Sequence, residues 1–268
     1  MYDITSSPDI QALVDIHPKT KKPIPWDRKK KETNKLAESH QRINEQDPLF
    51  KDQSKKLMEC GRFLEFRNYY NAGQKRLQRA NFCKYRLCPM CSWRRSLKIF
   101  GQASQVMDEA KKQGYVFIFV TLTIRNCPGD QLQKTIDELY QATTRLRRQG
   151  WFKKAIQGWM QVTEVTHNVN PKSDNYDTYH PHLHAIWAVD PKYFKSRDYI
   201  SQAKLTEYWQ KALKVDYKPI VHIQRAETAT KGHIREVAKY SVKPGDVLVD
   251  DDKLTDSAVT TLDFALYN

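Results

Sequence analysis

Two histidines one residue apart carry the clearest chemical signal in this chain. His182 and His184 lie in an apolar run, residues 179–189, that is typical of a β-strand, and His180 precedes them. Because side chains alternate between the two faces of a strand, the imidazoles of His182 and His184 point the same way and can bind one divalent metal ion. Solvent-facing or buried structural histidines would have the same spacing. Three of the chain's eight histidines fall within five residues, which favours the metal site.

A lone carboxylate in a second apolar segment is the expected third ligand. Glu164 lies within residues 158–167, which are also typical of a strand. If this strand pairs with the histidine strand, Glu164 reaches the same metal ion. Two imidazoles and one carboxylate leave coordination positions open, so the ion can bind a substrate oxygen and act as a Lewis acid. The alternative is an ion pair between Glu164 and a basic neighbour.

A tyrosine further along the chain is a candidate nucleophile. The helix expected over residues 231–243 carries Tyr240, and Glu236 lies one turn before it. Lys239 and Lys243 flank the phenol. A free phenol has a pKa of about 10 and nearby cations lower it, so Tyr240 can attack a phosphodiester. An ordinary amphipathic helix would also expose a tyrosine and pair its glutamate with a lysine, but the histidines and the basic charge favour the nucleophile.

Four of the five cysteines have the spacing of a structural metal site. Cys83, Cys88 and Cys91 follow the pattern C-x4-C-x2-C, and Cys60 is the best fourth ligand. We therefore expect a structural Zn²⁺ ion in this region. Cys127 lies too far along the chain and is expected to be a buried thiol.

The charge of the chain indicates a polyanionic partner. Its 268 residues contain 45 Lys and Arg against 31 Asp and Glu, which gives a net charge of +14. Such an excess favours nucleic acid as the partner. A membrane surface is the competing polyanion, but no segment has the apolar length of a signal or a span, so we expect a cytoplasmic protein. The residues expected to contact DNA phosphates are Arg86, Arg94, Arg95, Lys98 and Lys239.

The order of expected elements predicts an α+β fold of the ferredoxin-like type. Strands and helices alternate as β-α-β-β-α-β, the split β-α-β unit. In that fold an antiparallel sheet carries its helices on one face, and the histidines would lie on the other, open face. The expected strands are residues 115–124, 158–167, 179–189 and 220–224, and the expected helices between them are residues 131–148 and 198–213.

Composition divides the chain into four segments. Residues 1–55 are basic and polar with weak periodicity, so we expect a partly flexible arm, for which a solvated tail without a specific role is the alternative. Residues 56–113 form the cysteine- and arginine-rich region, in which a helix is expected over residues 96–113. Residues 114–245 hold the catalytic domain, and residues 246–268 form an acidic C-terminal segment.

These motifs, in this order, resemble the single-tyrosine rolling-circle replication initiators (Rep) of small bacterial plasmids, which belong to the HUH endonuclease superfamily. The resemblance covers residues 60–265, and the conjunction is far more specific than any one motif. The matching segments are residues 83–95, 119–124, 164–166, 180–184 and 236–243.

The resemblance implies a metal-dependent nicking and closing enzyme. Tyr240 would cut one strand of the double-strand origin, presented as a hairpin or as single-stranded DNA, and keep the 5′ phosphate, leaving a 3′ hydroxyl for a DNA polymerase. His182, His184 and Glu164 would bind Mg²⁺ or Mn²⁺. Lys243 would assist Tyr240, and Glu236 would activate water for termination or, alternatively, orient its neighbours.

Other functions and partners stay open at this point. A relaxase or transposase uses the same chemistry, and a non-catalytic nucleic-acid-binding module has the same fold but carries aromatics where this chain has histidines. No phosphate-binding loop of an ATPase is present, so a host helicase would open the duplex. The sequence leaves a homodimer open, and family members that continue beyond Asn268 suggest a shortened chain.

Overall fold

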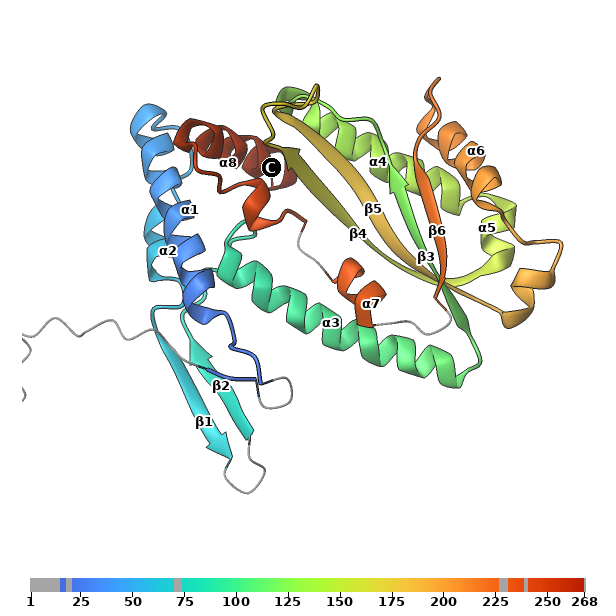
Figure 1. The fold of residues 1–268 in the computed structure, drawn as a ribbon, viewed down its shortest axis with the longest axis horizontal. Helices are drawn as coiled ribbons and strands as arrows, with labels where there is room; N and C mark the ends of the chain where they lie inside the picture. The colour runs from blue at the N-terminus through green and yellow to red at the C-terminus, as the bar shows by residue number, and fades with distance from the viewer. Residues whose placement is uncertain (1–14, 18–20, 70–73, 227–230, 239–240, 268) are drawn as a thin grey trace, which may run out of the picture. The chain divides into compact units, whose positions relative to one another are not determined.

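The chain forms two compact units, residues 1–91 and 92–268. The computed structural model describes residues 15–17, 21–69, 74–226, 231–238 and 241–267 (Figure 1). The expected α+β class is confirmed, because both units combine helices with antiparallel strands. No helix in these described ranges has the length and apolar character needed to cross a membrane.

The first unit contains a long helix where the sequence predicted a weakly structured arm. Helix α1 (Trp26–Gln46) is followed by α2 (Ser54–Glu59) and by an antiparallel hairpin of β1 (Leu64–Tyr69) and β2 (Gln74–Ala80). The buried side of α1 recurs at helical spacing but includes polar residues, which concealed the periodicity. Its buried residues are Trp26, Lys29, Thr33, Leu36, Ala37, Ser39, His40 and Ile43.

The second unit is built on a four-stranded antiparallel sheet. Its strands are β3 (Val116–Thr123), β4 (Ile156–Asn168), β5 (Thr178–Val189) and β6 (Val221–Ala226), in the order β4-β5-β3-β6. All four lie where the sequence predicted strands, because their apolar residues are β-branched or aromatic. The connecting helices are α4 (Leu132–Arg147), the short α5 (Gly150–Ala155) and α6 (Gln202–Leu213).

One face of this sheet packs on α4 and α6. Leu183 lies between the two metal-site histidines and points into this core, as do Ala185 and Trp187. Trp209 of α6 is fully buried, and its indole Nε1 donates a hydrogen bond of 2.7 Å to the carbonyl oxygen of Thr123. The histidine strand therefore has a rigid support behind it, as expected.

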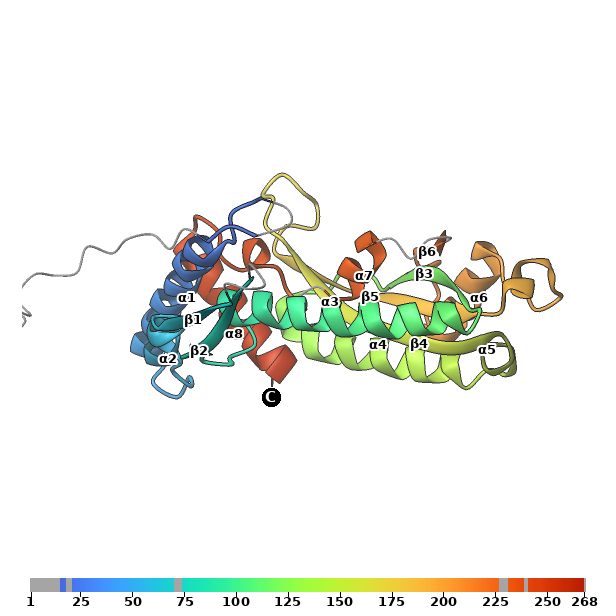
Figure 2. The ribbon, with the colours of Figure 1, turned by 90° about the horizontal axis from the view of Figure 1, so that it is seen from below.

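The opposite face is partly covered, whereas the sequence predicted an open face. Helix α3 (Pro89–Lys112) and helix α7 (Lys231–Val237) cover part of it. Figure 2 shows α7 and α4 on opposite sides of the sheet. Helix α3 also begins seven residues before the expected start at residue 96, because proline is well tolerated in the first turn of a helix. The packed residues include Ala103, Met107, Phe117, Phe119, Ile186, Ile234 and Val237.

Helix α7 is shorter than predicted. Its described part ends at Val237, whereas the sequence predicted a helix to residue 243. Lys243 has an extended backbone, with φ −79° and ψ 143°, and Pro244 follows it. A residue before proline is disfavoured in the helical region, so the helix would not be expected to include Lys243. The chain continues through η4 (Pro244–Asp246) into α8 (Asp252–Tyr267).

Candidate functional site

The pairing of β4 with β5 brings the three predicted metal ligands together. Glu164 lies opposite His182, and His184 is two residues further along β5. The Glu164 Oε2 atom lies 3.2 Å from Nε2 of His184 and 3.6 Å from Nε2 of His182. One ligand atom from each of the three residues falls within 4.8 Å of the others. This donor set suits a hard or borderline divalent cation with open coordination positions.

The other ring nitrogen of each histidine is held by a second partner. Nδ1 of His182 lies 3.1 Å from the carbonyl oxygen of His180, which can only accept, so this nitrogen donates. Nδ1 of His184 lies 3.2 Å from Oγ1 of Thr121. Such bonds orient the rings of metal-binding histidines and leave Nε2 as the ligand atom. Thr121 was not predicted as a site residue. Its polar side chain within the apolar strand expected over residues 115–124 was a usable signal.

The carboxylate of Glu164 is buried, and the ammonium group of Lys243 balances its negative charge. Its side chain is 2% exposed, and Oε1 lies 2.6 Å from the Lys243 Nζ atom. Burial alone would raise the pKa of Glu164, but hydrogen bonds with His182, His184 and Lys243 more than offset it and hold this pKa well below its usual range. Glu164 therefore makes both predicted kinds of contact: Oε2 faces the two histidines, and Oε1 forms the ion pair with Lys243.

Lys243 was predicted to lie on the helix of Tyr240. It instead has an extended backbone and lies beside the candidate metal site, where it pairs with Glu164. Burial alone would lower the pKa of its ammonium group, but the ion pair with Glu164 reverses this and the net shift is upward. Glu236 on α7 is a further, smaller cause of that increase. Glu236 therefore acts electrostatically on the same group as Glu164. Tyr240 and Lys239 lie outside the described residues.

The segment that carries Lys243 is fixed to β4 on both sides. The amide of Val165 donates a 2.7 Å hydrogen bond to the carbonyl oxygen of Ser241. Nδ1 of the buried His167 lies 3.1 Å from the carbonyl oxygen of Asp246, and its Nε2 lies 2.8 Å from Oδ1 of Asp177. His167 was not predicted as a site residue. Its position on the same strand as Glu164 was the only signal.

The four predicted zinc ligands form a compact cluster in the first unit. The Cys60 sulfur lies 3.6 Å from those of Cys88 and Cys91, and Cys83 lies 3.6 Å from Cys91. Four thiolates around a tetrahedral Zn²⁺ ion, at about 2.3 Å each, are separated by about 3.8 Å. The backbone amide of Lys84 donates to the sulfur of Cys91 at 3.2 Å, a second contact typical of such sites. The arrangement therefore fits zinc.

The fifth cysteine is not part of this cluster, and the predicted DNA-contact residues lie in the cysteine loop and on α3. Cys127 is buried in the second unit, as expected for a structural thiol. Arg95 and Lys98 are exposed on α3, while Arg94 is half-buried and its guanidinium lies 5.8 Å from the ring of Trp93. Arg86 is exposed in the cysteine loop. Their contact with DNA stays a prediction.

Comparison with known proteins identifies relatives across most of the chain. The family described as "Replication protein" matches residues 74–268. "Protein rep" from Bacillus amyloliquefaciens is 34% identical over 277 residues, which cover 96% of this chain and 80% of that relative. "Protein rep" from Streptococcus pneumoniae is 39% identical over 226 residues, which cover 82% of this chain and 68% of the relative. No solved structure is significantly similar.

We expect the purified protein to contain one zinc ion per chain in the cysteine cluster. Cys88→Ser should abolish it, because three thiolates and a hydroxyl bind zinc far more weakly. Metal analysis by mass spectrometry measures the content. Cys127→Ser is the matched control, a buried cysteine outside the cluster, and should keep the ion. Zinc retained in Cys88→Ser, or lost in both variants, would contradict the assignment.

We expect a second, exchangeable ion at the histidines. Titration calorimetry with Mn²⁺ should detect a site that disappears in a His182→Ala, His184→Ala double variant, because one carboxylate alone cannot hold the ion. Zinc content should not change. His17→Ala, an exposed histidine of the first unit, should bind Mn²⁺ like the wild type. Equal Mn²⁺ binding by the double variant would exclude this site.

Proposed function

This chain belongs to the replication protein (Rep) family of plasmid replication initiators, and on that basis we propose that it nicks one strand of the plasmid origin by metal-dependent tyrosine transesterification. The observation that carries the proposal is the convergence of Glu164, His182 and His184 on one point. Lys243 contacts the other carboxylate oxygen of Glu164, Oε1. A binding protein has no need of an ion site with open positions. The proposal places the chain among the HUH endonucleases.

The metal ligands would position the scissile phosphate. A bound Mg²⁺ or Mn²⁺ ion supplies Lewis-acid stabilisation of the charge that develops on the phosphoryl oxygens. His182 and His184 present Nε2 because their Nδ1 atoms are already engaged. Glu164 stays ionised in its buried position because of its three cationic or donating neighbours. The β4–β5 pair would thus hold the ligands for the phosphate on two paired strands.

Tyr240 would be the nucleophile. Its oxygen forms a bond to phosphorus while the bond from phosphorus to the 3′ oxygen breaks, and the phenolic proton is transferred to that leaving oxygen. The product is a 5′-phosphotyrosyl linkage and a free 3′ hydroxyl. The support is the place of Tyr240 in the chain: the next residue, Ser241, accepts a hydrogen bond from the amide of Val165, which follows Glu164. The Lys243 ammonium would stabilise the phenolate.

Glu236 would end the cycle. A carboxylate near the phosphotyrosyl linkage can take a proton from water, which then hydrolyses the bond and releases Tyr240. Glu236 lies on α7, whose Ile234 and Val237 pack on the sheet face of the histidines, which supports a place near the reaction. Salt bridging that orients Lys243 is the alternative role. The experiments below separate the two.

The remaining parts of the proposal concern the fold and the partners. The antiparallel order β4-β5-β3-β6, with α4 and α6 as the two crossovers, supports a ferredoxin-like assignment for residues 114–245. Origin DNA would be bound as a hairpin or a single strand, and exposed Arg86, Arg95 and Lys98 would contact its phosphates. A host helicase and a DNA polymerase would act after the nick.

Covalent capture tests the nucleophile. The full chain is incubated with Mn²⁺ and an origin hairpin oligonucleotide of its own plasmid, and the products are separated on a denaturing gel. Wild type should give a protein–DNA adduct and Tyr240→Phe none, because phenylalanine has no attacking oxygen. Tyr176→Phe, an exposed tyrosine of the same unit, is the control. An adduct in Tyr240→Phe, or DNA binding without cleavage by wild type, would overturn the proposal.

The same assay followed over time tests Glu236. Glu236→Gln should form the adduct at nearly the wild-type rate, but release by water should fall about 100-fold or more if Glu236 is a general base. Glu207→Gln, an exposed glutamate on α6, should behave like wild type. If adduct formation and release fall together, the orienting role is correct and the general base lies elsewhere.

A further inference from the structure

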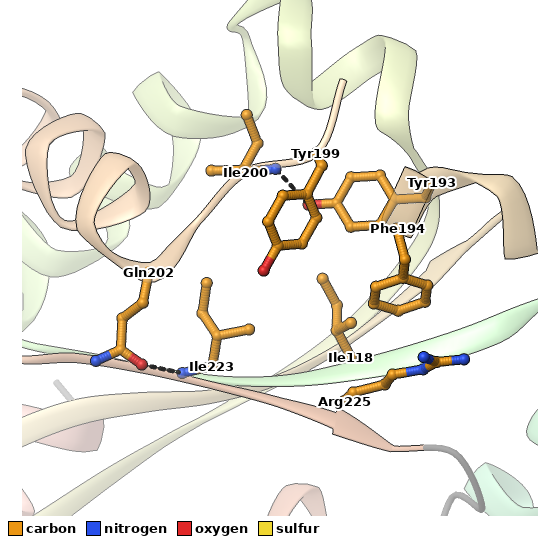
Figure 3. A pocket seen from close by; sticks show the side chains of 8 residues that line it. All are labelled: Ile118, Tyr193, Phe194, Tyr199, Ile200, Gln202, Ile223 and Arg225. Atoms are coloured by element: carbon orange, nitrogen blue, oxygen red, sulfur yellow. Dashed lines mark hydrogen bonds between the residues drawn. The ribbon is translucent and has the colours of Figure 1, made fainter. Parts of the chain in front are cut away.

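A pocket lies at the free edge of the sheet, where the proposed chemistry does not use it. Strand β6 is the last strand in the order, and the pocket forms between it, η3 (Pro191–Lys195) and the start of α6. Its volume is about 210 Å³, less than the roughly 300–1,000 Å³ typical of sites for whole drug-sized ligands. The lining residues are Ile118, Tyr193, Phe194, Tyr199, Ile200, Gln202, Ile223 and Arg225 (Figure 3).

Three aromatic rings line this pocket, and one of them is fixed by a hydrogen bond. Figure 3 shows the rings of Tyr193, Phe194 and Tyr199 above Ile118 and Ile223. The ring centroids of Tyr193 lie 5.3 Å from Phe194 and 5.6 Å from Tyr199. The Tyr193 hydroxyl accepts a 3.1 Å hydrogen bond from the amide of Ile200, which fixes the buried ring. The pocket is therefore preformed and presents flat π-surfaces.

Among the described residues that line the pocket, the one charged side chain is cationic. The guanidinium of Arg225 lies 4.3 Å from the centroid of Phe194, and the residue is exposed. Lys192, Lys195 and Arg197 are exposed in the adjoining segment. The nearby carboxylate of Asp198 is already paired with Lys154 at 2.9 Å. This rim favours a ligand that combines a planar ring with negative charge.

Strand β6 is not free to pair with a peptide strand at Ile223. The amide of Ile223 points away from β3 and donates a 3.3 Å hydrogen bond to Oε1 of Gln202. A partner strand that paired with β6 would need this group. The side chain of Gln202 therefore blocks strand addition and leaves the aromatic pocket as the binding feature.

We propose that this pocket binds one unpaired base of the origin strand, with Arg225 on its phosphate; the inference rests on the proposed action on DNA. Stacking on aromatic rings and guanidinium planes is the usual way in which proteins hold splayed bases. The pocket suits one ring system, and the net charge of +14 favours the polyanion.

The pocket lies on the reverse face of the sheet from the metal site. Ile118 and Arg225 are paired across β3 and β6, whereas Thr121, an odd number of residues from Ile118, points to His184. A single strand that enters both sites must pass around the β6 edge. The pocket would therefore hold a flanking base and set which phosphodiester reaches Glu164.

Photocrosslinking and binding test the pocket without relying on cleavage. The full-length Tyr240→Phe chain, without divalent metal, is irradiated with a single-stranded oligonucleotide that carries 5-iododeoxyuridine in place of every thymidine. Mass spectrometry should find the crosslink within residues 193–199. Affinity for oligothymidylate should fall about fivefold or more in Tyr199→Ala, and Arg225→Gln should lower the salt dependence by about one phosphate contact.

Tyr140→Ala is the matched control, since Tyr140 is 45% exposed and Tyr199 is 48% exposed. It should bind like the parent chain. Crosslinks found only outside residues 193–199, or equal affinity of Tyr199→Ala and its parent, would overturn the pocket. Failure of the proposed nicking is scored separately, as absence of an adduct in the wild type with Mn²⁺. Either result can occur without the other.

Discussion

The candidate site depends on the pairing register of β4 with β5. Glu164 faces His182 across these two strands, and both project to the face that α7 covers. A slip of one residue in this register would turn Glu164 to the opposite face, into the core under α4 and α6. The apolar residue next to Glu164 opposes the slip: Val165 is fully buried and would have to leave its place in the interior.

Charge balance is the second constraint on the site. A carboxylate as buried as that of Glu164 is costly unless each oxygen has a partner. Oε2 faces the two imidazoles and Oε1 faces the ammonium of Lys243. Lys243 reaches it because Ser241 and Asp246, on either side, are bonded to β4. The extended backbone before Pro244 is therefore part of the site's construction, although it lies far from Glu164 in sequence.

Sequence patterns predicted the strands, the ligand triad and the cysteine cluster, because each has a short-range signature. Alternation placed His182 and His184 on one face, and cysteine spacing identified Cys83, Cys88 and Cys91. Features that depend on tertiary contacts were not predicted. Helix α1 was hidden because its buried stripe includes Thr33 and Ser39, and the roles of Thr121 and His167 depend on partners that are distant in the chain.

The placement of Lys243 on the carboxylate of Glu164 has a thermodynamic consequence. A divalent ion and the ammonium group attract the same negative charge, so each weakens the hold of the other, and the coupling is reciprocal. The affinity of the triad for a metal ion would thereby be lower than that of the same three ligands without the lysine. Occupancy of the triad would in turn weaken the ion pair that ties Lys243 to Glu164.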